Sequence, residues 1–204
     1  MRCWVLVDSA FNVHLYRHGV LRTSAVAYDA SDLGNRHAHL TNHCIAATHN
    51  DYGKFEPTNE MWYEEFDAEL GRRFAELAAA HDGSVLKGVV LPQIKRHVVQ
   101  TLLASRERLE ASGDYYRPFQ LFGYDFLVDD TLRVWLCEVN ASPAVADHLL
   151  PGLVSSLLRV AVDPFFPPLA ELVGGGVDAY EAAAAAREAK GEGFERIFAS
   201  GREP

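Results

Sequence analysis

The sequence lacks the features that would place it in a membrane or outside the cell. No hydrophobic run in its 204 residues is long enough to span a bilayer. The first segment is broken by Asp8 and is too short for a signal peptide. The three cysteines, Cys3, Cys44 and Cys137, have unrelated spacings that give neither a CxxC site nor an even disulfide framework. We therefore expect a cytoplasmic protein with no membrane partner.

Basic charge is scarce as well. The chain carries 19 basic and 28 acidic side chains, a formal net charge of −9. Residues 1–110 hold 12 basic and 14 acidic side chains, and residues 111–204 hold 7 and 14. This balance argues against a nucleic-acid partner, and an acidic partner would need a local basic patch in the first half.

Several catalytic motifs are missing. Gly174-Gly175-Gly176 follows no predicted strand and carries no Lys-Ser/Thr pair, so it is not a phosphate loop. The chain has no GxSxG motif and no Cys/His nucleophile pattern. We therefore expect chemistry that does not use a covalent protein nucleophile.

Polar residues interrupt one predicted β-hairpin, residues 120–143. Two apolar runs flank a turn, which we place at residues 129–132 as a four-residue connection. Asp125 lies within the first run, and Glu138 and Asn140 end the second. On one face of the sheet, these oxygen ligands would suit Mg²⁺. The alternative is a register that leaves both acids solvated on an edge strand, and the pattern alone does not decide between them.

The rest of the chain predicts an α+β fold with an antiparallel sheet and about three helices. His18-Gly19 is typical of a hairpin turn, and Asn59 is a suitable N-cap for a helix. The predicted strands cover residues 3–7, 13–16 and 20–24, and the predicted helices cover residues 60–80, 92–110 and 145–162. We divide the chain into residues 1–168 and an Ala/Gly-rich acidic tail, residues 169–204, helical or disordered.

Two arginines and a histidine-rich tract are further candidates. Arg2 adjoins one predicted strand and Arg22 lies within another, and both could bind phosphate or form ordinary surface contacts. Residues 35–50 contain four histidines, and we rank a zinc site there below a polar active-site loop that includes Thr41 and Asn42. The histidines are His37, His39, His43 and His49.

Taken in order, these features resemble the C-terminal half of the tubulin tyrosine ligase family, within the ATP-grasp superfamily. The resemblance covers roughly residues 2–168. It rests on YRHGVLRTS (16–24), HLTNHCI (39–45), YGKFEPTNEM (52–61) and FQLFGYDFLVDDTLRVWLCEVNASPA (119–144). HLTNHCI and FQLFG look closer to the tyrosine ligase than to the related glutamylating and glycylating enzymes.

The resemblance implies cofactors and a role for each residue. ATP and one or two Mg²⁺ ions would be bound. Asp125, Glu138 and Asn140 would hold the metal, Arg2, Arg22 and Asn140 would contact the nucleotide phosphates, and His39 would lie nearby. Thr41 and Asn42 would lie near the ribose. Arg22, Glu138 and Asn140 would also act in catalysis.

The implied reaction adds free tyrosine to the C-terminal glutamate of detyrosinated α-tubulin through an acyl phosphate. The α-tubulin tail or the tubulin dimer would be the partner, with a location on microtubules or in cilia. The resemblance also implies an N-terminal ATP-grasp half, and its absence ahead of Met1 predicts a fragment or an incomplete gene product. The rivals are a tubulin polyglutamylase or glycylase, and a non-catalytic tubulin-binding fragment.

Overall fold

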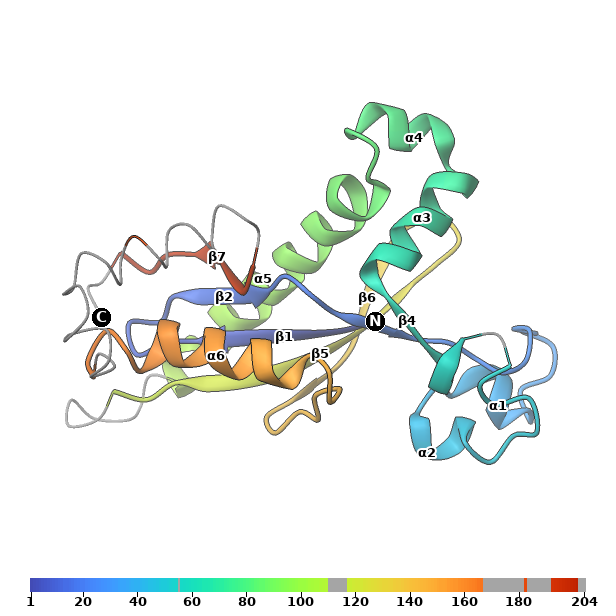
Figure 1. The fold of residues 1–204 in the computed structure, drawn as a ribbon, viewed down its shortest axis with the longest axis horizontal. Coiled ribbons are helices and arrows are strands. Elements are labelled where there is room, and N and C mark those ends of the chain that lie inside the picture. Colours follow the sequence, from blue (N-terminus) through green and yellow to red (C-terminus); the bar gives the residue numbers. More distant parts are fainter. Residues whose placement is uncertain (55, 110–116, 167–181, 183–191, 202–204) are drawn as a thin grey trace. The chain divides into compact units, whose positions relative to one another are not determined.

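The structure is a computed structural model that describes residues 1–54, 56–109, 117–166, 182 and 192–201. Strands and helices alternate irregularly along the described residues (Figure 1). The strands are β1 (Arg2–Val7), β2 (Val13–Tyr16), β3 (Val20–Arg22), β4 (Glu60–Trp62), β5 (Gln120–Val128), β6 (Val134–Asn140) and β7 (Phe194–Phe198). The helices are α1 (Arg36–His39), α2 (His43–Ala46), α3 (Tyr63–Arg73), α4 (Ala75–Ala80), α5 (Leu91–Leu109) and α6 (Leu150–Ala161), with a short 3-10 helix η1 (Pro57–Asn59) and a π-helical segment η2 (Leu86–Val90). The predicted α+β class is confirmed.

The chain divides into two compact units. The first contains residues 1–2, 19–92 and 127–135, and the second contains residues 3–18, 93–126 and 136–204. No helix in the part of the chain that the structure describes combines the length and apolar character needed to cross a bilayer.

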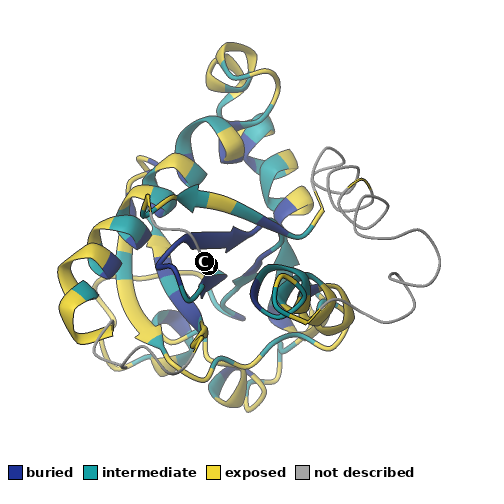
Figure 2. Ribbon diagram, turned by 90° about the vertical axis from the view of Figure 1, so that its left-hand side faces the viewer, coloured by how far each residue is buried: buried dark blue, intermediate teal, exposed yellow. Residues whose placement is uncertain are grey.

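The sheet of the second unit is buried on both faces. In β1, Cys3 to Val7 are each at most 6% exposed, although their side chains alternate between the faces. On one face, α6 approaches β2, where Gly152 leaves room for the Tyr16 hydroxyl. Helix α5 packs on β5, since Thr101 shares a hydrogen bond of 3.1 Å with the Tyr124 hydroxyl. In Figure 2 the buried residues gather on the strands.

Strand pairing in this unit is set by β1, which pairs with β2 and with β5. The β1–β2 pair is antiparallel, with Val5 opposite Leu15, and β2 in turn pairs antiparallel with β7. Strand β7 lies in the segment that the sequence assigned to a helical or disordered tail. That prediction is wrong for residues 194–198, and most of the remaining tail falls outside the described residues.

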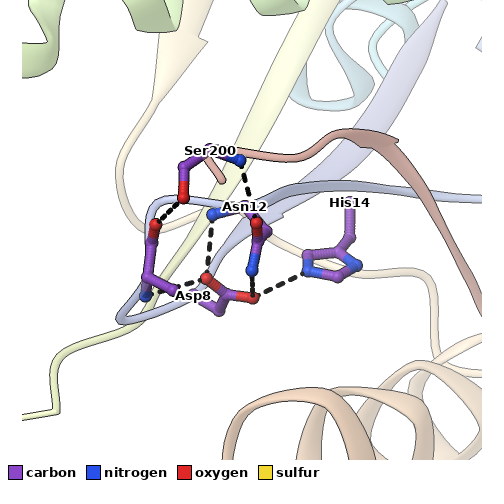
Figure 3. Close-up of polar contacts among 5 residues, drawn as sticks. Asp8, Asn12, His14 and Ser200 are labelled. Carbon is purple, nitrogen blue, oxygen red and sulfur yellow. Dashed lines mark hydrogen bonds and ion pairs between the residues drawn. The ribbon is translucent and has the colours of Figure 1, made fainter. Parts of the chain in front are cut away.

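Strand β7 is held at its start by side chains of α5 and of the residue after β2, and beyond its end by the turn between β1 and β2. At its start, Glu195 accepts from Lys95 Nζ at 2.5 Å and from Arg17 Nη1 at 3.4 Å. Beyond its end, Ser200 N–H donates to Asn12 Oδ1 at 3.0 Å, and the Ser200 hydroxyl donates to the carbonyl of Ala10 (Figure 3).

The first unit corrects two sequence predictions. Strand β3 pairs with Arg2 of β1 and with β4, so His18-Gly19 is not a hairpin turn between β2 and β3. The predicted helix 60–80 begins only at Tyr63, because Glu60–Trp62 pairs with β3 as strand β4. Tertiary hydrogen bonds to β3 outweigh the local helical preference of these residues. Asn59 is consequently not an N-cap.

Acidic side chains close in the sequence or in space fix the starts of two helical segments. Glu65, in the first turn of α3, accepts the backbone N–H of Trp62 at 3.0 Å. The Asp67 carboxylate then accepts from the hydroxyl of Ser84 and from Leu86 N–H, which fixes the start of η2. Helix α5, predicted at residues 92–110, is confirmed as Leu91–Leu109. Of the predicted apolar stripe it buries Ile94, Val98 and Leu102, whereas the fourth member, Leu109, is exposed at the end of the helix.

Candidate metal- and phosphate-binding site

The predicted metal ligands come together at the open end of the β5–β6 hairpin, in the second unit. Asn140 Nδ2 donates to Asp125 Oδ2 at 3.2 Å and to Glu138 Oε1 at 3.1 Å. Asp125 is half-buried, as is Asn140, and Glu138 is exposed. The polar residues of the hairpin therefore form one cluster.

The cluster fits a magnesium site in its donor chemistry. Two carboxylates and one amide oxygen are the hard ligands that Mg²⁺ takes, and exposure of Glu138 leaves room for water and phosphate oxygens. The amide nitrogen now bridges the carboxylates, and a half-turn about its last torsion would present the oxygen instead. In the described part of the chain, no group of three or more His, Cys, Asp or Glu side chains forms a metal site. The cluster has only two such residues, and its third member is Asn140.

The hairpin turn differs from the predicted four-residue connection. Strand β5 ends at Val128 and β6 begins at Val134, so residues 129–133 form a five-residue connection. Asp129 N–H donates to the carbonyl of Arg133 at 3.0 Å. Leu132 adopts φ +64°, in the left-handed region, and is 4% exposed.

The two predicted phosphate-binding arginines lie in the first unit. Arg2 pairs with Val20, and Arg22 lies two residues further along β3, so both side chains are on one face of the sheet. Arg22 Nε is buried and has no hydrogen-bond partner among the described residues. A buried donor without an acceptor is rare in native structures, and an anionic ligand would satisfy it.

The loop after Arg22 is tied to the segment that precedes β4. Thr23 N–H donates to the carbonyl of Asn59 at 2.9 Å, and Asn59 Nδ2 returns a bond to the carbonyl of Thr23 at 3.1 Å. Thr23 Oγ1 donates to Glu56 Oε2 at 2.6 Å. Asn59 is 4% exposed with φ +53°, a left-handed conformation that asparagine tolerates. The sequence did not predict that Glu56 and Asn59 hold the loop after Arg22, although both residues lie in the segment YGKFEPTNEM.

The histidine tract forms two short helices joined by Leu40 to Asn42. His39 ends α1, and its Nε2 lies 2.8 Å from the carbonyl of Asp32. Asn42 precedes α2, where its carbonyl accepts two backbone N–H groups but its side chain makes no capping bond. Thr41 lies between them and is half-buried. The predicted phosphate- and ribose-binding residues therefore share one unit, apart from Asn140, which belongs to the second unit with the predicted metal ligands.

These features define an α+β protein with a carboxylate–amide cluster on a hairpin, as expected for part of an ATP-grasp fold. The model of the tubulin-tyrosine ligase family matches residues 1–170. The chain belongs to this family.

Its relatives include enzymes that are named for adding other amino acids to tubulin. The chain is 31% identical over 174 residues to the tubulin monoglycylase TTLL3 of Danio rerio, which covers 80% of the chain and 21% of that protein. It is 33% identical over 147 residues to the probable tubulin polyglutamylase TTLL2 of Homo sapiens, 71% of the chain and 23% of that protein. It is 26% identical over 174 residues to the tubulin glycylase 3C of Tetrahymena thermophila, a match that covers 80% of the chain and 15% of that protein. The chain thus spans less than a quarter of the length of these three relatives.

Proposed function

We propose that this chain is the metal- and phosphate-binding part of an ATP-dependent ligase that joins an amino acid to tubulin. The observation that carries the proposal is the Asn140 amide bridging Asp125 and Glu138, in a chain of the tubulin-tyrosine ligase family. The location we propose is cytoplasmic, where tubulin is found.

The two groups of residues have separate tasks in this reaction. Asp125, Glu138 and Asn140 would hold Mg²⁺, which neutralises charge on the ATP phosphates. Arg22, whose buried Nε has no hydrogen-bond partner in the described part of the chain, and Arg2 on the same face of the sheet would bind the phosphates and stabilise the charge that develops during transfer. Thr41, Asn42 and His39 would contact the nucleotide near the ribose and phosphates.

The reaction needs no covalent protein nucleophile. A substrate carboxylate attacks the γ-phosphorus of ATP, which forms an acyl phosphate and releases ADP. The amine of the incoming amino acid then attacks the acyl carbon, and phosphate leaves. The role of the chain is to position these groups and offset the repulsion between anions.

The names of the relatives favour glycine or glutamate as the added amino acid. The HLTNHCI and FQLFG segments favour tyrosine. We therefore keep tyrosine ligation to the C-terminal glutamate of α-tubulin as the second candidate.

Incorporation of labelled amino acids distinguishes these candidates. The full chain is incubated with ATP, Mg²⁺ and detyrosinated tubulin, together with labelled glycine, glutamate or tyrosine in turn. We expect one of the three to be incorporated, and the Glu138→Gln variant to lose about 100-fold or more of that activity. Because Glu138 is exposed, the circular dichroism spectrum and melting temperature should not change.

Two outcomes would contradict the proposal. Full activity in the Glu138→Gln variant would remove the carboxylate from the mechanism. Binding of the chain to tubulin with no incorporation of any of the three amino acids would favour a non-catalytic, tubulin-binding role.

A further inference from the structure

Asn140 occupies a terminal position in the hairpin. It is the last residue of β6, and the ladder of backbone hydrogen bonds that fixes a strand stops there. Strand ends fray, whereas metal ligands must be held within about 0.5 Å of their productive positions. Something beyond the strand must therefore hold the Asn140 side chain between Asp125 and Glu138.

The next four residues, Ala141 to Ala144, are held at three points, and we name this segment the 141–144 clasp. At its start, Gln120 Nε2 donates to the carbonyl of Ala141 at 2.6 Å and to the carbonyl of Leu121 at 2.7 Å. This amide connects the first residues of β5 to the residue that follows Asn140.

The middle of the clasp lies directly on β5. A Cβ atom at Gly123 would lie 2.6 Å from Pro143 Cβ, so only glycine permits Pro143 to pack this closely. Gly123 is two residues before Asp125 in the same strand, so this contact and the Asp125 carboxylate are on one face of β5.

The end of the clasp is fixed by a buried aromatic side chain. Trp4 Nε1 donates to the carbonyl of Ala144 at 3.2 Å, and Trp4 is 1% exposed. Since β1 is buried on both faces, its tryptophan gives the clasp a rigid anchor.

We propose that Gln120, Gly123 and Trp4 are positioning residues of the metal site, which act through the 141–144 clasp on Asn140. The clasp closes over β5 and prevents β6 from fraying at Asn140. None of the three residues supplies a metal ligand. The inference rests on the proposed function, because it concerns the same metal site.

Manganese binding to the full chain tests the proposal without an activity assay. Mn²⁺ takes the same oxygen ligands as Mg²⁺, and electron paramagnetic resonance measures its free concentration directly. We expect Gln120→Ala and Trp4→Phe each to weaken Mn²⁺ affinity about 10-fold, as loss of supporting contacts does at other metal sites. Gly123→Ala, which must displace Pro143, should weaken it at least as much.

Matched variants separate positioning from general damage. Gln100 is also exposed and lies on α5, so Gln100→Ala should leave Mn²⁺ affinity unchanged. Gly71 has open space around its Cα, so Gly71→Ala is the control for Gly123→Ala. Gln120 is itself exposed, and its alanine variant should melt at the wild-type temperature.

A double-mutant cycle tests whether Gln120 acts through Asn140. In an Asn140→Ala background, Gln120→Ala should cause no further loss of Mn²⁺ affinity, since the side chain that it positions is absent. Hydrogen exchange of residues 138–144 should be faster in Gln120→Ala and in Trp4→Phe than in the wild type.

The possible failures are distinguishable. If the wild type binds no Mn²⁺, the proposed metal site is wrong, and the positioning role is wrong with it. If the wild type binds Mn²⁺ and the three variants bind it equally well, the metal site stands and the positioning role is overturned. The positioning role would also be overturned if Gln120→Ala lowered Mn²⁺ affinity by the same factor in the wild-type and in the Asn140→Ala background.

Discussion

Asp8 shows how one side chain can organise a turn that the sequence presents as ordinary. Its Oδ1 accepts from Ala10 N–H at 3.0 Å and from Asn12 N–H at 2.9 Å. Its Oδ2 accepts from Asn12 Nδ2 at 3.0 Å and lies 3.0 Å from His14 Nε2. Figure 3 shows these groups converging on the carboxylate, and Ser200 bonds to Asn12 and to the carbonyl of Ala10. Through Asn12, Asp8 thus fixes the chain beyond β7.

Removal of this carboxylate should destabilise the fold. We expect Asp8→Ala to lower the free energy of unfolding by about 1–3 kcal/mol at pH 7, because it leaves buried donors without an acceptor. Urea denaturation measures the change. Asp51→Ala, which removes a carboxylate that is 41% exposed, should cost less than about 0.5 kcal/mol. Equal decreases in the free energy of unfolding for Asp8→Ala and Asp51→Ala would contradict the role of Asp8.

The same residue gives stability a defined pH dependence. Burial alone raises the pKa of Asp8, but hydrogen bonds from His14 and Asn12 and the charge of His14 outweigh it, so the pKa is lowered from 3.8. The folded state therefore binds fewer protons at Asp8 than the unfolded state does. The difference in stability between the wild type and Asp8→Ala should be complete above pH 3.8 and shrink as the pH falls through the lower, folded-state pKa.

At the scale of elements, the β5–β6 hairpin is fixed at its turn as well as at its open end. The Asp129 carboxylate accepts from Thr131 Oγ1 at 2.7 Å and from Trp135 Nε1 at 2.9 Å. The guanidinium of Arg133 lies over the Trp135 ring, 4.0 Å from its centroid. Hydrogen bonds from Thr131 and then Trp135, with backbone amides, lower the pKa of Asp129 to about 2.

Nuclear magnetic resonance of the Trp135 indole N–H tests this turn. A carboxyl of pKa about 2 remains ionised at pH 4, whereas one at 3.8 would be about 40% protonated. We therefore expect the Trp135 indole resonance to stay constant between about pH 7 and pH 4. The Trp4 indole, bonded to a carbonyl, provides the internal reference. A Trp135 titration with a midpoint near 3.8 would contradict the tight turn.

Sequence patterns predicted some elements better than others, for physical reasons. Helix α5 has a continuous apolar stripe and a proline in its first turn, and its prediction is correct within one residue at each end. The segment 60–62 has helical residues after a good N-cap candidate, yet it pairs with β3. A strand pairs with residues that are distant in the sequence, so the pattern within a short segment cannot identify its partner.

At the scale of the whole molecule, the described end of the chain contributes to the core. Strand β7 lies beyond residue 170, where the match to the family model ends. Its first residue, Phe194, is 8% exposed, and its ring lies 5.2 Å from that of Tyr16. Pairing with β7 also covers the edge of β2. The segment is therefore an integral strand of the sheet.

Substitution of Phe194 measures the contribution of β7. We expect Phe194→Ala to lower the free energy of unfolding by about 3 kcal/mol, since it empties a buried ring position. Phe119→Ala removes a ring that is 43% exposed and should cost less than about 1 kcal/mol. Thermal or urea denaturation compares them. A Phe194→Ala variant as stable as Phe119→Ala would show that β7 is peripheral.

The sequence by itself determined the α+β class, helix α5, and the polar residues that break the apolar pattern of the hairpin. Alternation, periodicity and turn chemistry act over a few residues, so they can be read locally. Only the tertiary structure decided that Asn140 joins Asp125 to Glu138, that β3 pairs with β1, and that β7 completes the sheet. The 141–144 clasp belongs to this second group. Its anchor, Trp4, is 140 residues away from Ala144, and only the folded chain brings the indole N–H to that carbonyl.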